Sequence, residues 1–250
     1  MTLEARIKKD ARKLERFKNK YKKKRCFIIG NGPSLQTEDL DKLHMSDEYS
    51  FGSNGIHLAF EQTKWRPTFY TLSDCKALRE WYQSIKHLEV KYKFFADSAF
   101  SSYNLPLLKN CYIYRLVENN YYPFCPDFSS DISKYVGNSY TVTYISLQIA
   151  AYMGFSEMYL LGVDHDFAFQ QDASGKIITS EVKNYFIDNY NPGNKTGFPR
   201  LYLCDKAYIK ADTYSRFHGF RIYNATRGGK LEFFERVDFD SITFNQRKDI

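Results

Sequence analysis

The sequence predicts an α/β fold in which a mostly parallel sheet carries helices on both faces. Short strand-like runs alternate with helical patterns along the chain, which is typical of parallel strands joined by crossover helices. The chain has 250 residues, enough for one sizeable domain with a real core. Its first apolar run, residues 26–30, leads directly into a Gly-rich turn and the start of a helix.

The elements follow one another in a Rossmann-like order. The runs expected as strands are 26–30, 49–52, 68–72, 91–96, 112–116, 158–162 and 220–223. The segments expected as helices are 35–43, 75–88, 139–153 and 206–218. The stretch 167–203 is polar, aromatic and interrupted by Gly and Pro, so we expect a lid there rather than sheet. The sequence therefore predicts a single α/β domain over residues 26–250, preceded by an arm.

Residues 1–25 form a basic arm that we expect to be an amphipathic helix. The arm holds 12 Lys and Arg against three acidic residues, a charge of +9, and the rest of the chain sums to −2. Such a helix can lie on an anionic membrane surface or bind a partner, or it can pack one edge on the domain. Nucleic acid would be attracted only without sequence specificity. The apolar residues that recur at helical spacing in the arm are Leu3, Ile7, Leu14, Phe17 and Tyr21.

The cysteines and the hydropathy of the sequence indicate the cellular compartment in which the chain is expected. Its five cysteines are odd in number and include no C-x-x-C pair, which indicates reduced thiols rather than a disulfide framework or a zinc site. We see no apolar stretch of transmembrane length, and the N-terminus lacks the apolar segment of a signal peptide. The sequence therefore predicts a cytoplasmic protein whose membrane contact, if any, is peripheral at the inner face of the cell membrane.

The turn after the first expected strand has the composition of a nucleotide phosphate site. Gly30 and Gly32 let the backbone approach an anion, Pro33 fits the first turn of a helix, and Ser34 offers a hydroxyl near the positive end of the helix dipole. Asn31 adds a neutral donor and acceptor. The turn lacks the Lys of a P-loop and the third Gly of a dinucleotide fingerprint. We predict that Asn31, Gly32, Pro33 and Ser34 bind a nucleotide; a purely structural turn is the alternative.

Polar clusters follow five of the expected strands. Besides the first turn they are 53–55, 73–74, 164–166 and 224–226. Because the carboxyl ends of parallel strands meet at one edge of a sheet, we expect these clusters to converge on one cleft. Asn54 and Asn224 are further candidates for nucleotide binding, with turn formation as the alternative.

The cluster Asp164-His165-Asp166 follows a well-defined apolar run and is the candidate catalytic centre. His165 can act as a general base because an imidazole ordinarily titrates near neutrality, and Asp164 or Asp166 can orient it. Alternatively, the carboxylates bind Mg²⁺ through their oxygens, or they cap a helix beside a surface histidine.

Two further residues precede expected helices. Asp74 is a candidate contact for an acceptor or a metal, although an Asp in this position is usually an N-cap. Ser139 can cap the helix that follows it or contact a phosphate.

The motifs resemble those of two related families. Residues 27–35 resemble the opening motif of the bacterial sialyltransferases that make lipooligosaccharide caps, and residues 154–164 resemble their second signature. Residues 137–139, 161–167 and 222–232 are more similar to a family found among bacterial surface-polysaccharide genes and labelled after an archaeal 6-hydroxymethylpterin pyrophosphokinase. The resemblance implies the GT-A-like variant of the Rossmann-like fold that the sialyltransferases have.

The resemblance also implies roles for particular residues. Asn31, Ser34 and Asn54 would hold the nucleotide of a CMP-linked sugar, and the helix start near Ser139 would contact the donor phosphate or carboxylate.

The chain departs from the sialyltransferase pattern at three points. Thr71 stands where these enzymes have an Asn, and Asp166 stands where they have a Tyr. Their general-base His comes from the lid, yet residues 167–203 contain no His. The base must therefore be another group, and His165 or Asp164 is the natural substitute.

Taken together, the motifs predict a glycosyltransferase that uses a nucleotide-activated sugar, with CMP favoured, in the synthesis of bacterial surface polysaccharide or lipooligosaccharide. No cofactor is required, although Mg²⁺ can assist. The expected partners are the donor, a glycan or lipid-linked acceptor and an anionic membrane surface bound through residues 1–25, and a homo-oligomer is compatible with the sequence. A Mg²⁺-dependent pterin-type pyrophosphokinase and a non-catalytic nucleotide-binding scaffold remain alternatives.

Overall fold

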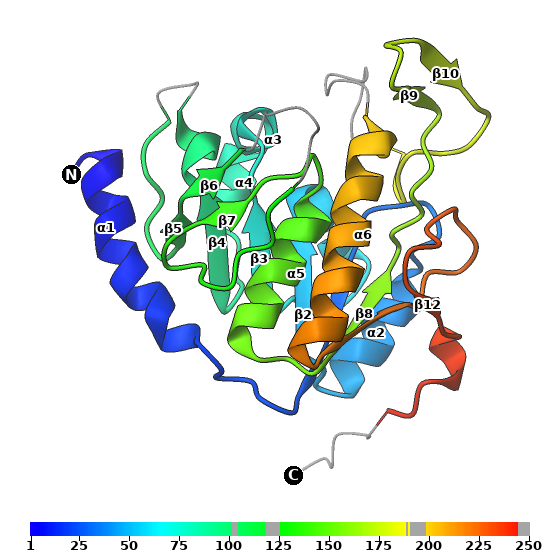
Figure 1. Ribbon diagram of the computed structural model, residues 1–250, viewed down its shortest axis with the longest axis horizontal. Coiled ribbons are helices and arrows are strands. Elements are labelled where there is room, and N and C mark those ends of the chain that lie inside the picture. Colours follow the sequence, from blue (N-terminus) through cyan, green and yellow to red (C-terminus); the bar gives the residue numbers. More distant parts are fainter. Residues whose placement is uncertain (102–104, 119–125, 189, 191–198, 245–250) are drawn as a thin grey trace.

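The structure, a computed structural model, is an α/β fold built on an eight-stranded sheet with helices on both faces (Figure 1). It describes residues 1–101, 105–118, 126–188, 190 and 199–244. The strands of the sheet are β1 (Arg25–Ile29), β2 (Ser50–Ser53), β3 (Phe69–Leu72), β4 (Tyr92–Ala96), β5 (Tyr112–Tyr114), β8 (Glu157–Leu161), β11 (Arg221–Asn224) and β12 (Glu235–Arg236). Every pair of neighbours runs parallel, so the predicted fold class is confirmed.

The order across the sheet is β12-β11-β8-β1-β2-β3-β4-β5, which makes β1 the point where the chain reverses direction. From β1 the chain adds β2 to β5 on one side and later adds β8, β11 and β12 on the other. In open α/β sheets the ligand lies outside the carboxyl ends of the strands at such a switch point. The topology therefore places the residues after β1, β2 and β8 where a ligand is expected.

All seven expected strands are present, with ends that move by one or two residues. The run expected over 112–116 is divided, because β5 ends at Tyr114 and the chain leaves the sheet at Arg115. The next residues form β6 (Leu116–Val117), which pairs with β7 (Val136–Gly137) in a separate two-stranded ladder. β12 was not expected from the sequence, because it has only two residues, both exposed.

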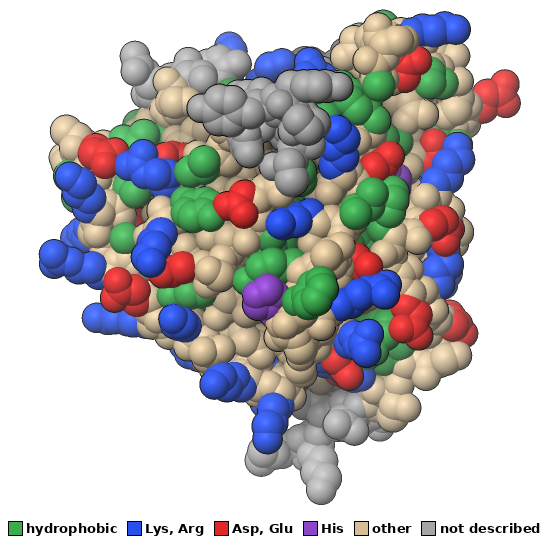
Figure 2. All heavy atoms as spheres, in the orientation of Figure 1, with side chains coloured by type: hydrophobic (Ala, Val, Ile, Leu, Met, Phe, Trp, Pro, Cys, Tyr) green, Lys and Arg blue, Asp and Glu red, His purple; other side chains and the backbone are tan. Residues whose placement is uncertain are grey.

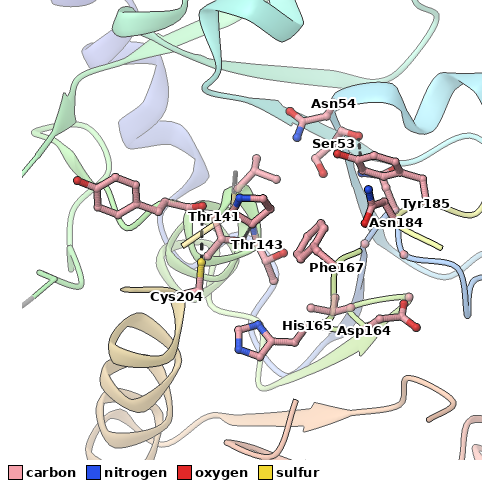
Figure 3. A pocket seen from close by; sticks show the side chains of 18 of the residues that line it. Ser53, Asn54, Thr141, Thr143, Asp164, His165, Phe167, Asn184, Tyr185 and Cys204 are labelled. Carbon is pink, nitrogen blue, oxygen red and sulfur yellow. Dashed lines mark hydrogen bonds between the residues drawn. The ribbon is translucent and has the colours of Figure 1, made fainter. Parts of the chain in front are cut away.

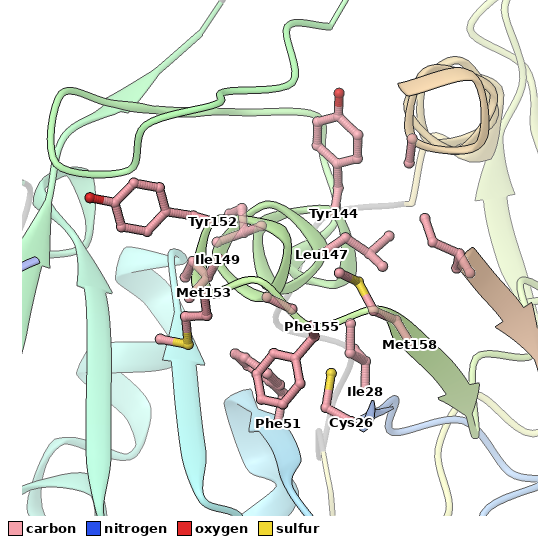
Figure 4. Packing of buried hydrophobic residues seen from close by; sticks show 14 of the residues in the cluster. Cys26, Ile28, Phe51, Tyr144, Leu147, Ile149, Tyr152, Met153, Phe155 and Met158 are labelled. Atoms are coloured by element: carbon pink, nitrogen blue, oxygen red, sulfur yellow. The ribbon is translucent and has the colours of Figure 1, made fainter. Parts of the chain in front are cut away.

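Alternate strand residues point to opposite faces of the sheet and form two apolar layers. The helices are α2 (Thr37–Met45), α3 (Cys75–Glu80) and α4 (Tyr82–Lys86) on one face, and α5 (Val142–Met153) and α6 (Leu201–His218) on the other. In β1, Cys26 and Ile28 lie in the layer of α5 and α6, whereas Phe27 and Ile29 lie in the opposite layer. Figure 4 shows α5 above Cys26, Ile28 and Phe51. Both faces of the sheet are thus covered, as the apolar character of its strands requires.

The boundaries of all four expected helices differ from expectation, and α2 is shifted by two residues, from 35–43 to Thr37–Met45. α5 begins at Val142 rather than Ser139, because Thr141 is the N-cap and its hydroxyl accepts from the backbone N of Thr143. The helix expected over 75–88 is divided at Trp81 into α3 and α4. α6 begins at Leu201, earlier than expected.

The basic arm is helical and packs on the domain. α1 (Leu3–Leu14) and a 3-10 turn (Glu15–Phe17) run beside β5 at the edge of the sheet (Figure 1). Ile7 lies in one apolar layer, and Leu14, Phe17 and Tyr21 lie in the other, so the arm covers this edge. Of the alternatives left open for the apolar stripe, the structure shows packing on the domain, and the stripe is not a free membrane-binding face.

A buried ion pair fastens the arm to the edge strand. The guanidinium of Arg6 bonds the carboxylate of Asp10 and donates to the carbonyl oxygen of Cys111 at 2.6 Å. Asp10 also accepts from the backbone N of Ile113 at 3.1 Å. This pair satisfies backbone groups of the β5 edge that would otherwise lack partners.

The stretch expected as a lid leaves the sheet, as anticipated. It contains a hairpin of β9 (Phe169–Gln171) and β10 (Ile177–Thr179), after which residues 184–188 and 190 return over the carboxyl edge of the main sheet. Residues 189 and 191–198 of the expected lid lie outside the described residues.

Candidate functional site

A cleft of about 460 Å³ opens at the carboxyl edge of the sheet, where β1, β2 and β8 end (Figure 3). This volume suits a small-molecule ligand. Of the residues predicted from the sequence, Asn31, Gly32, Asn54, Asp74, Asp164, His165 and Asp166 line it. Pro33, Ser34, Ser139 and Asn224 are not among the described residues of its lining.

Asn31 and Asn54 present acceptors that lack partners. The Nδ2 of Asn31 donates to the carbonyl oxygen of Ser53 at 3.2 Å, which fixes the orientation of the amide. The Oδ1 atoms of Asn31 and Asn54 are both buried without a hydrogen-bond partner among the described residues. An unsatisfied buried acceptor costs roughly 1–3 kcal/mol. Asn31 and Asn54 both line the cleft, so a ligand that brings hydrogen-bond donors could satisfy these oxygens once the amide side chains turn toward it.

Gly30 and Gly32 allow the turn after β1 to pack against the loop after β8. A Cβ on Gly30 would lie 2.2 Å from the carbonyl oxygen of Gly162, and a Cβ on Gly32 would lie 1.9 Å from Oδ2 of Asp164. The backbone N of Gly32 also donates to the Gly162 oxygen at 2.9 Å. These glycines are required for contact between the two segments, whether or not an anion binds beside them.

Ser34 is used inside the protein, where it holds Asp164. Its hydroxyl donates to Oδ2 of Asp164 at 2.8 Å, and its backbone N approaches the same oxygen at 3.4 Å. Burial raises the pKa of Asp164 above its ordinary value, and the two hydrogen bonds from Ser34 oppose the rise. The Ser34 side chain therefore positions a carboxylate at the rim of the cleft.

His165 pairs with a carboxylate that the sequence did not single out. Its Nε2 lies 2.6 Å from Oδ1 of Asp205 on α6, and its side chain is only 8% exposed. The imidazole packs edge-on against the rings of Tyr208 and Phe233. Asp205 therefore has the orienting position that was expected for Asp164 or Asp166. The side chains of Asp164 and His165 point in opposite directions (Figure 3).

The backbone explains why neighbouring side chains in this loop diverge. His165 has φ +54°, in the left-handed region that non-glycine residues seldom adopt. Asp166 then points to Lys230, whose Nζ lies 2.9 Å from Oδ2. Its Oδ1 is buried without a described partner and belongs to a residue that lines the cleft. Asp166 is thus a third unsatisfied acceptor at the site.

Three predicted residues are engaged in structural roles or lie apart from the cleft. Asp74 lines the cleft, but its Oδ1 accepts from the backbone N of Lys76 and Ala77, so it is the N-cap of α3. Asn224 is buried, and its amide bonds the backbone of Thr226 and Leu231. Ser139 is buried, and its hydroxyl has no partner among the described residues.

The segment 184–190 closes over the two asparagine turns. The backbone N of Phe186 donates to the carbonyl oxygen of Asn31 at 3.1 Å, and the backbone N of Gly55 donates to the Tyr190 hydroxyl at 2.9 Å. The ring of Tyr190 stacks on Tyr185 with centroids 4.0 Å apart. Burial raises the pKa of Tyr190 far above its ordinary value, so this hydroxyl stays neutral.

Sequence reasoning missed Asp205, Tyr190 and Arg200. Arg200 precedes α6 and brings a positive charge to the lining of the cleft, with its guanidinium 5.7 Å from the ring centroid of Tyr140. Asp205 lies 40 residues from His165 within a helix, so no short motif joins the two. The only available signal for Tyr190 was the aromatic composition of the lid.

The described part of the chain holds no group of three or more His, Cys, Asp and Glu side chains arranged to bind a metal ion. Among these described residues, Asp74, Asp164 and Asp166 accordingly do not form such a group. Among the helices described, none is both long and apolar enough to cross a membrane.

The parallel sheet, its switch point and the cleft at that point define a Rossmann-like α/β protein of the kind represented by a bacterial sialyltransferase. The chain belongs to the 6-hydroxymethylpterin diphosphokinase MptE-like family, whose sequence model matches residues 3–172. No curated protein sequence matches the chain. The predicted relationship to both families is thus confirmed at the level of family and fold.

Two solved structures share the fold at low sequence identity. The sialyltransferase CstII from Campylobacter jejuni, solved with the substrate analogue cytidine-5'-monophosphate, has a TM-score of 0.51 and 16% identity, with 91% of each chain covered. The MAf glycosyltransferase from Magnetospirillum magneticum AMB-1 has a TM-score of 0.54 and 14% identity. The match covers 96% of this chain but spans only 40% of the MAf chain.

Proposed function

We propose that this protein is a glycosyltransferase that uses a nucleotide-activated sugar, with CMP as the nucleotide. The observation that carries the proposal is that two residues lining the cleft at the switch point of the sheet, Asn31 and Asn54, each have a buried Oδ1 with no hydrogen-bond partner among the described residues. Ribose hydroxyls and the exocyclic amino group of cytosine are donors that can satisfy them. The shared fold with CstII, which was solved with CMP, supports this choice.

The positively polarised end of α5 is suited to the donor phosphate. Thr141, Val142 and Thr143 line the cleft at the first turn of this 12-residue helix. Its free backbone N–H groups and the helix dipole favour an anion there, and Arg200 adds a full charge. The leaving nucleotide gains negative charge as its bond to the sugar breaks, so this end of the cleft would stabilise the transition state.

His165 is the candidate base for the transfer step. The acceptor hydroxyl oxygen forms a bond to the anomeric carbon, the bond from that carbon to the nucleotide phosphate breaks, and the hydroxyl proton passes to the imidazole. With Nε2–H donating to Asp205, Nδ1 is the basic nitrogen, and the carboxylate stabilises the imidazolium that forms. Tyr185 and Tyr190 would help exclude water, so that transfer competes with hydrolysis.

The biological setting follows from the family resemblance. Relatives encoded among surface-polysaccharide genes favour a glycan or lipid-linked acceptor in a bacterial envelope pathway. The acceptor would enter beside Asp166, whose unpaired Oδ1 can accept from a sugar hydroxyl.

Nucleotide binding is the direct test. Thermal shift and calorimetry with CMP, CDP, UDP, GDP and ATP, each with and without Mg²⁺, should show tightest binding of a cytidine nucleotide and no requirement for the metal. Asn31→Ala should weaken that binding by roughly tenfold, the value of one or two hydrogen bonds. Ser34→Ala, which alters a neighbour in the same turn outside the lining, is the matched control and should bind normally.

The two alternatives give different results in the same panel. A pyrophosphokinase, which the family description favours, would prefer ATP with Mg²⁺ and lose binding on chelation. A non-catalytic scaffold would bind a nucleotide yet show no turnover with any CMP-sugar, and His165→Ala would change nothing.

A further inference from the structure

The exposed face of the arm is strongly basic because its apolar face is buried. Asp10 is buried in its pair with Arg6, and Glu4 bonds Arg115, which leaves Glu15 as the remaining acidic side chain of the arm. Figure 2 shows Lys and Arg side chains gathered along the edge of the molecule that the arm forms. The exposed basic side chains of this face are Lys8, Lys9, Arg12, Arg16, Lys18, Lys20, Lys22, Lys23 and Lys24.

The end of the arm runs along the amino edge of the sheet, opposite the cleft. A Cβ on Gly154, the C-cap of α5, would lie 3.2 Å from Cγ of Lys22. The carbonyl oxygen of Lys24 accepts from the backbone N of Ser156 at 2.8 Å, and the Ser156 oxygen accepts from the backbone N of Arg221 at 2.9 Å. Lys22 and Lys24 therefore lie beside the starts of β8 and β11, with Arg221 exposed at the same edge.

α6 ends at this edge and carries the most exposed large apolar side chain described. Phe217 is 83% exposed in the last turn of α6, between Arg216 and His218. Gly219 ends the helix, and β11 begins two residues later. An exposed aromatic residue at the same edge of the sheet as several lysines has the composition of a surface that inserts at a membrane interface.

We propose that this basic face, defined as the exposed Lys and Arg of residues 8–24 together with Phe217 and Arg221, docks on an anionic lipid bilayer. The Lys and Arg side chains supply the attraction to negatively charged headgroups, and Phe217 enters the headgroup region. The apolar stripe of the arm takes no part, because it is packed on the domain. The inserting group thus comes from α6, about 200 residues away in the sequence.

Charge and shape favour a bilayer over nucleic acid. Single-stranded nucleic acid is held by accessible aromatic platforms between basic residues. The aromatic rings of the arm, Phe17 and Tyr21, are buried instead, and Lys20 lies over them with its Nζ 5.5 Å and 5.8 Å from the ring centroids. The exposed surface offers charge and one apolar side chain, which suits a fluid anionic surface.

Vesicle flotation of the full chain tests the proposal. The protein should float with phosphatidylcholine vesicles that contain one-third phosphatidylglycerol, should not float with phosphatidylcholine alone, and should be released by high salt. Replacing Lys22, Lys23 and Lys24 together by Glu should weaken binding more than tenfold. Phe217→Ser should weaken it by roughly tenfold, the value of burying one aromatic side chain.

A charge-matched variant controls for net charge. Replacing Lys76, Lys176 and Lys183 by Glu changes the total charge equally at exposed positions near the cleft and lid, and binding should fall far less. Circular dichroism should show that all three variants remain folded. An equal loss in the control, or no flotation of the wild type at low salt, would overturn the proposal. Tighter binding to a single-stranded RNA than to anionic vesicles would assign the face to nucleic acid instead.

Discussion

The turns after β1 and β2 differ from the loop after β8, although all three meet at the same cleft. Asn31 and Asn54 in the first region are neutral, and their Oδ1 atoms have no partner among the residues that the structure describes. In the second region Asp164 bonds Ser34, His165 bonds Asp205, and Asp166 bonds Lys230. The first region is ready to receive hydrogen bonds from a ligand, whereas most of the polar capacity of the second is already used within the protein.

This difference distinguishes side chains that are available to bind a ligand from side chains that position other residues. A polar residue in a motif contributes to a ligand site only if its atoms are left available after folding. Ser34 shows the opposite case, because its hydroxyl lies in the expected nucleotide turn yet serves Asp164. Substitutions in either region, or at the contact between them, should therefore have different effects.

The largest effect is expected from the charged loop. If His165 is the base, His165→Ala should reduce kcat by roughly 10²- to 10⁴-fold without weakening CMP binding. Asp205→Asn should cause a smaller loss, since it removes the carboxylate that orients the imidazole. Steady-state kinetics over a range of pH measure both. Unchanged turnover in His165→Ala would leave this loop with a purely structural role.

Substitution at the contact between the two regions should have the next largest effect, on the stability of the fold. Gly30→Ala places a Cβ against the backbone carbonyl of Gly162, which cannot move without shifting β8, and should destabilise the fold by about 2–3 kcal/mol. Gly219→Ala is the control, because nothing lies within 4 Å of its Cβ and only its φ of +74° is unfavourable. It should cost about 1 kcal/mol in urea unfolding. If both variants lost the same unfolding free energy, the turn after β1 would accommodate the added Cβ without strain, contrary to the prediction.

Asn31 and Ser34 provide the sharpest test of the comparison itself. Asn31→Ala should weaken cytidine nucleotide binding by roughly tenfold and leave unfolding nearly unchanged. Ser34→Ala should do the reverse, costing about 1–2 kcal/mol in unfolding through the lost hydrogen bond to Asp164. Calorimetry and denaturant titration on the same two variants measure both effects. Loss of nucleotide binding in Ser34→Ala would show instead that the two regions form one binding site.

The smallest expected effect is a pH dependence of folding stability that comes from Asp164. The pKa of Asp164 is higher in the folded protein than its ordinary value of 3.8, so the folded state holds the proton more tightly. Its contribution to stability is therefore present at low pH and is lost as pH rises from about 4 through the raised pKa. In Asp164→Asn this loss should be absent, so the stability of the variant should gain relative to that of the wild type as the pH rises above about 4. Unfolding curves that run parallel over this range would contradict the assignment.

Local composition was sufficient to predict seven of the eight strands of the main sheet and the edge at which their polar ends meet. Apolar runs such as 158–162 indicate buried strands wherever they occur, and parallel strands bring their carboxyl ends together. The helix start near Ser139 was wrong by three residues, because Ser and Thr both serve as caps and only the backbone geometry selects Thr141.

Pairing between distant side chains could not be predicted. Asp164, His165 and Asp166 are adjacent in sequence, which made a mutual interaction the simplest interpretation. The left-handed backbone at His165 separates them, and each finds a partner far along the chain. The sequence likewise could not decide what the apolar face of the arm packs against, since the same amphipathic pattern fits a membrane and the edge of a sheet.

The lid contacts have a kinetic consequence. Phe186 bonds the carbonyl of Asn31, and Tyr190 accepts from the backbone of Gly55, so the lid is tied to the same two turns that would hold the nucleotide. If transfer takes place in this cleft, a spent nucleotide would leave only after these two contacts open, and the closed arrangement would exclude water during transfer. Turnover would then be paced by departure of the product, and a Tyr190→Phe variant that keeps the ring but loses the tie would turn over faster while holding its donor less tightly.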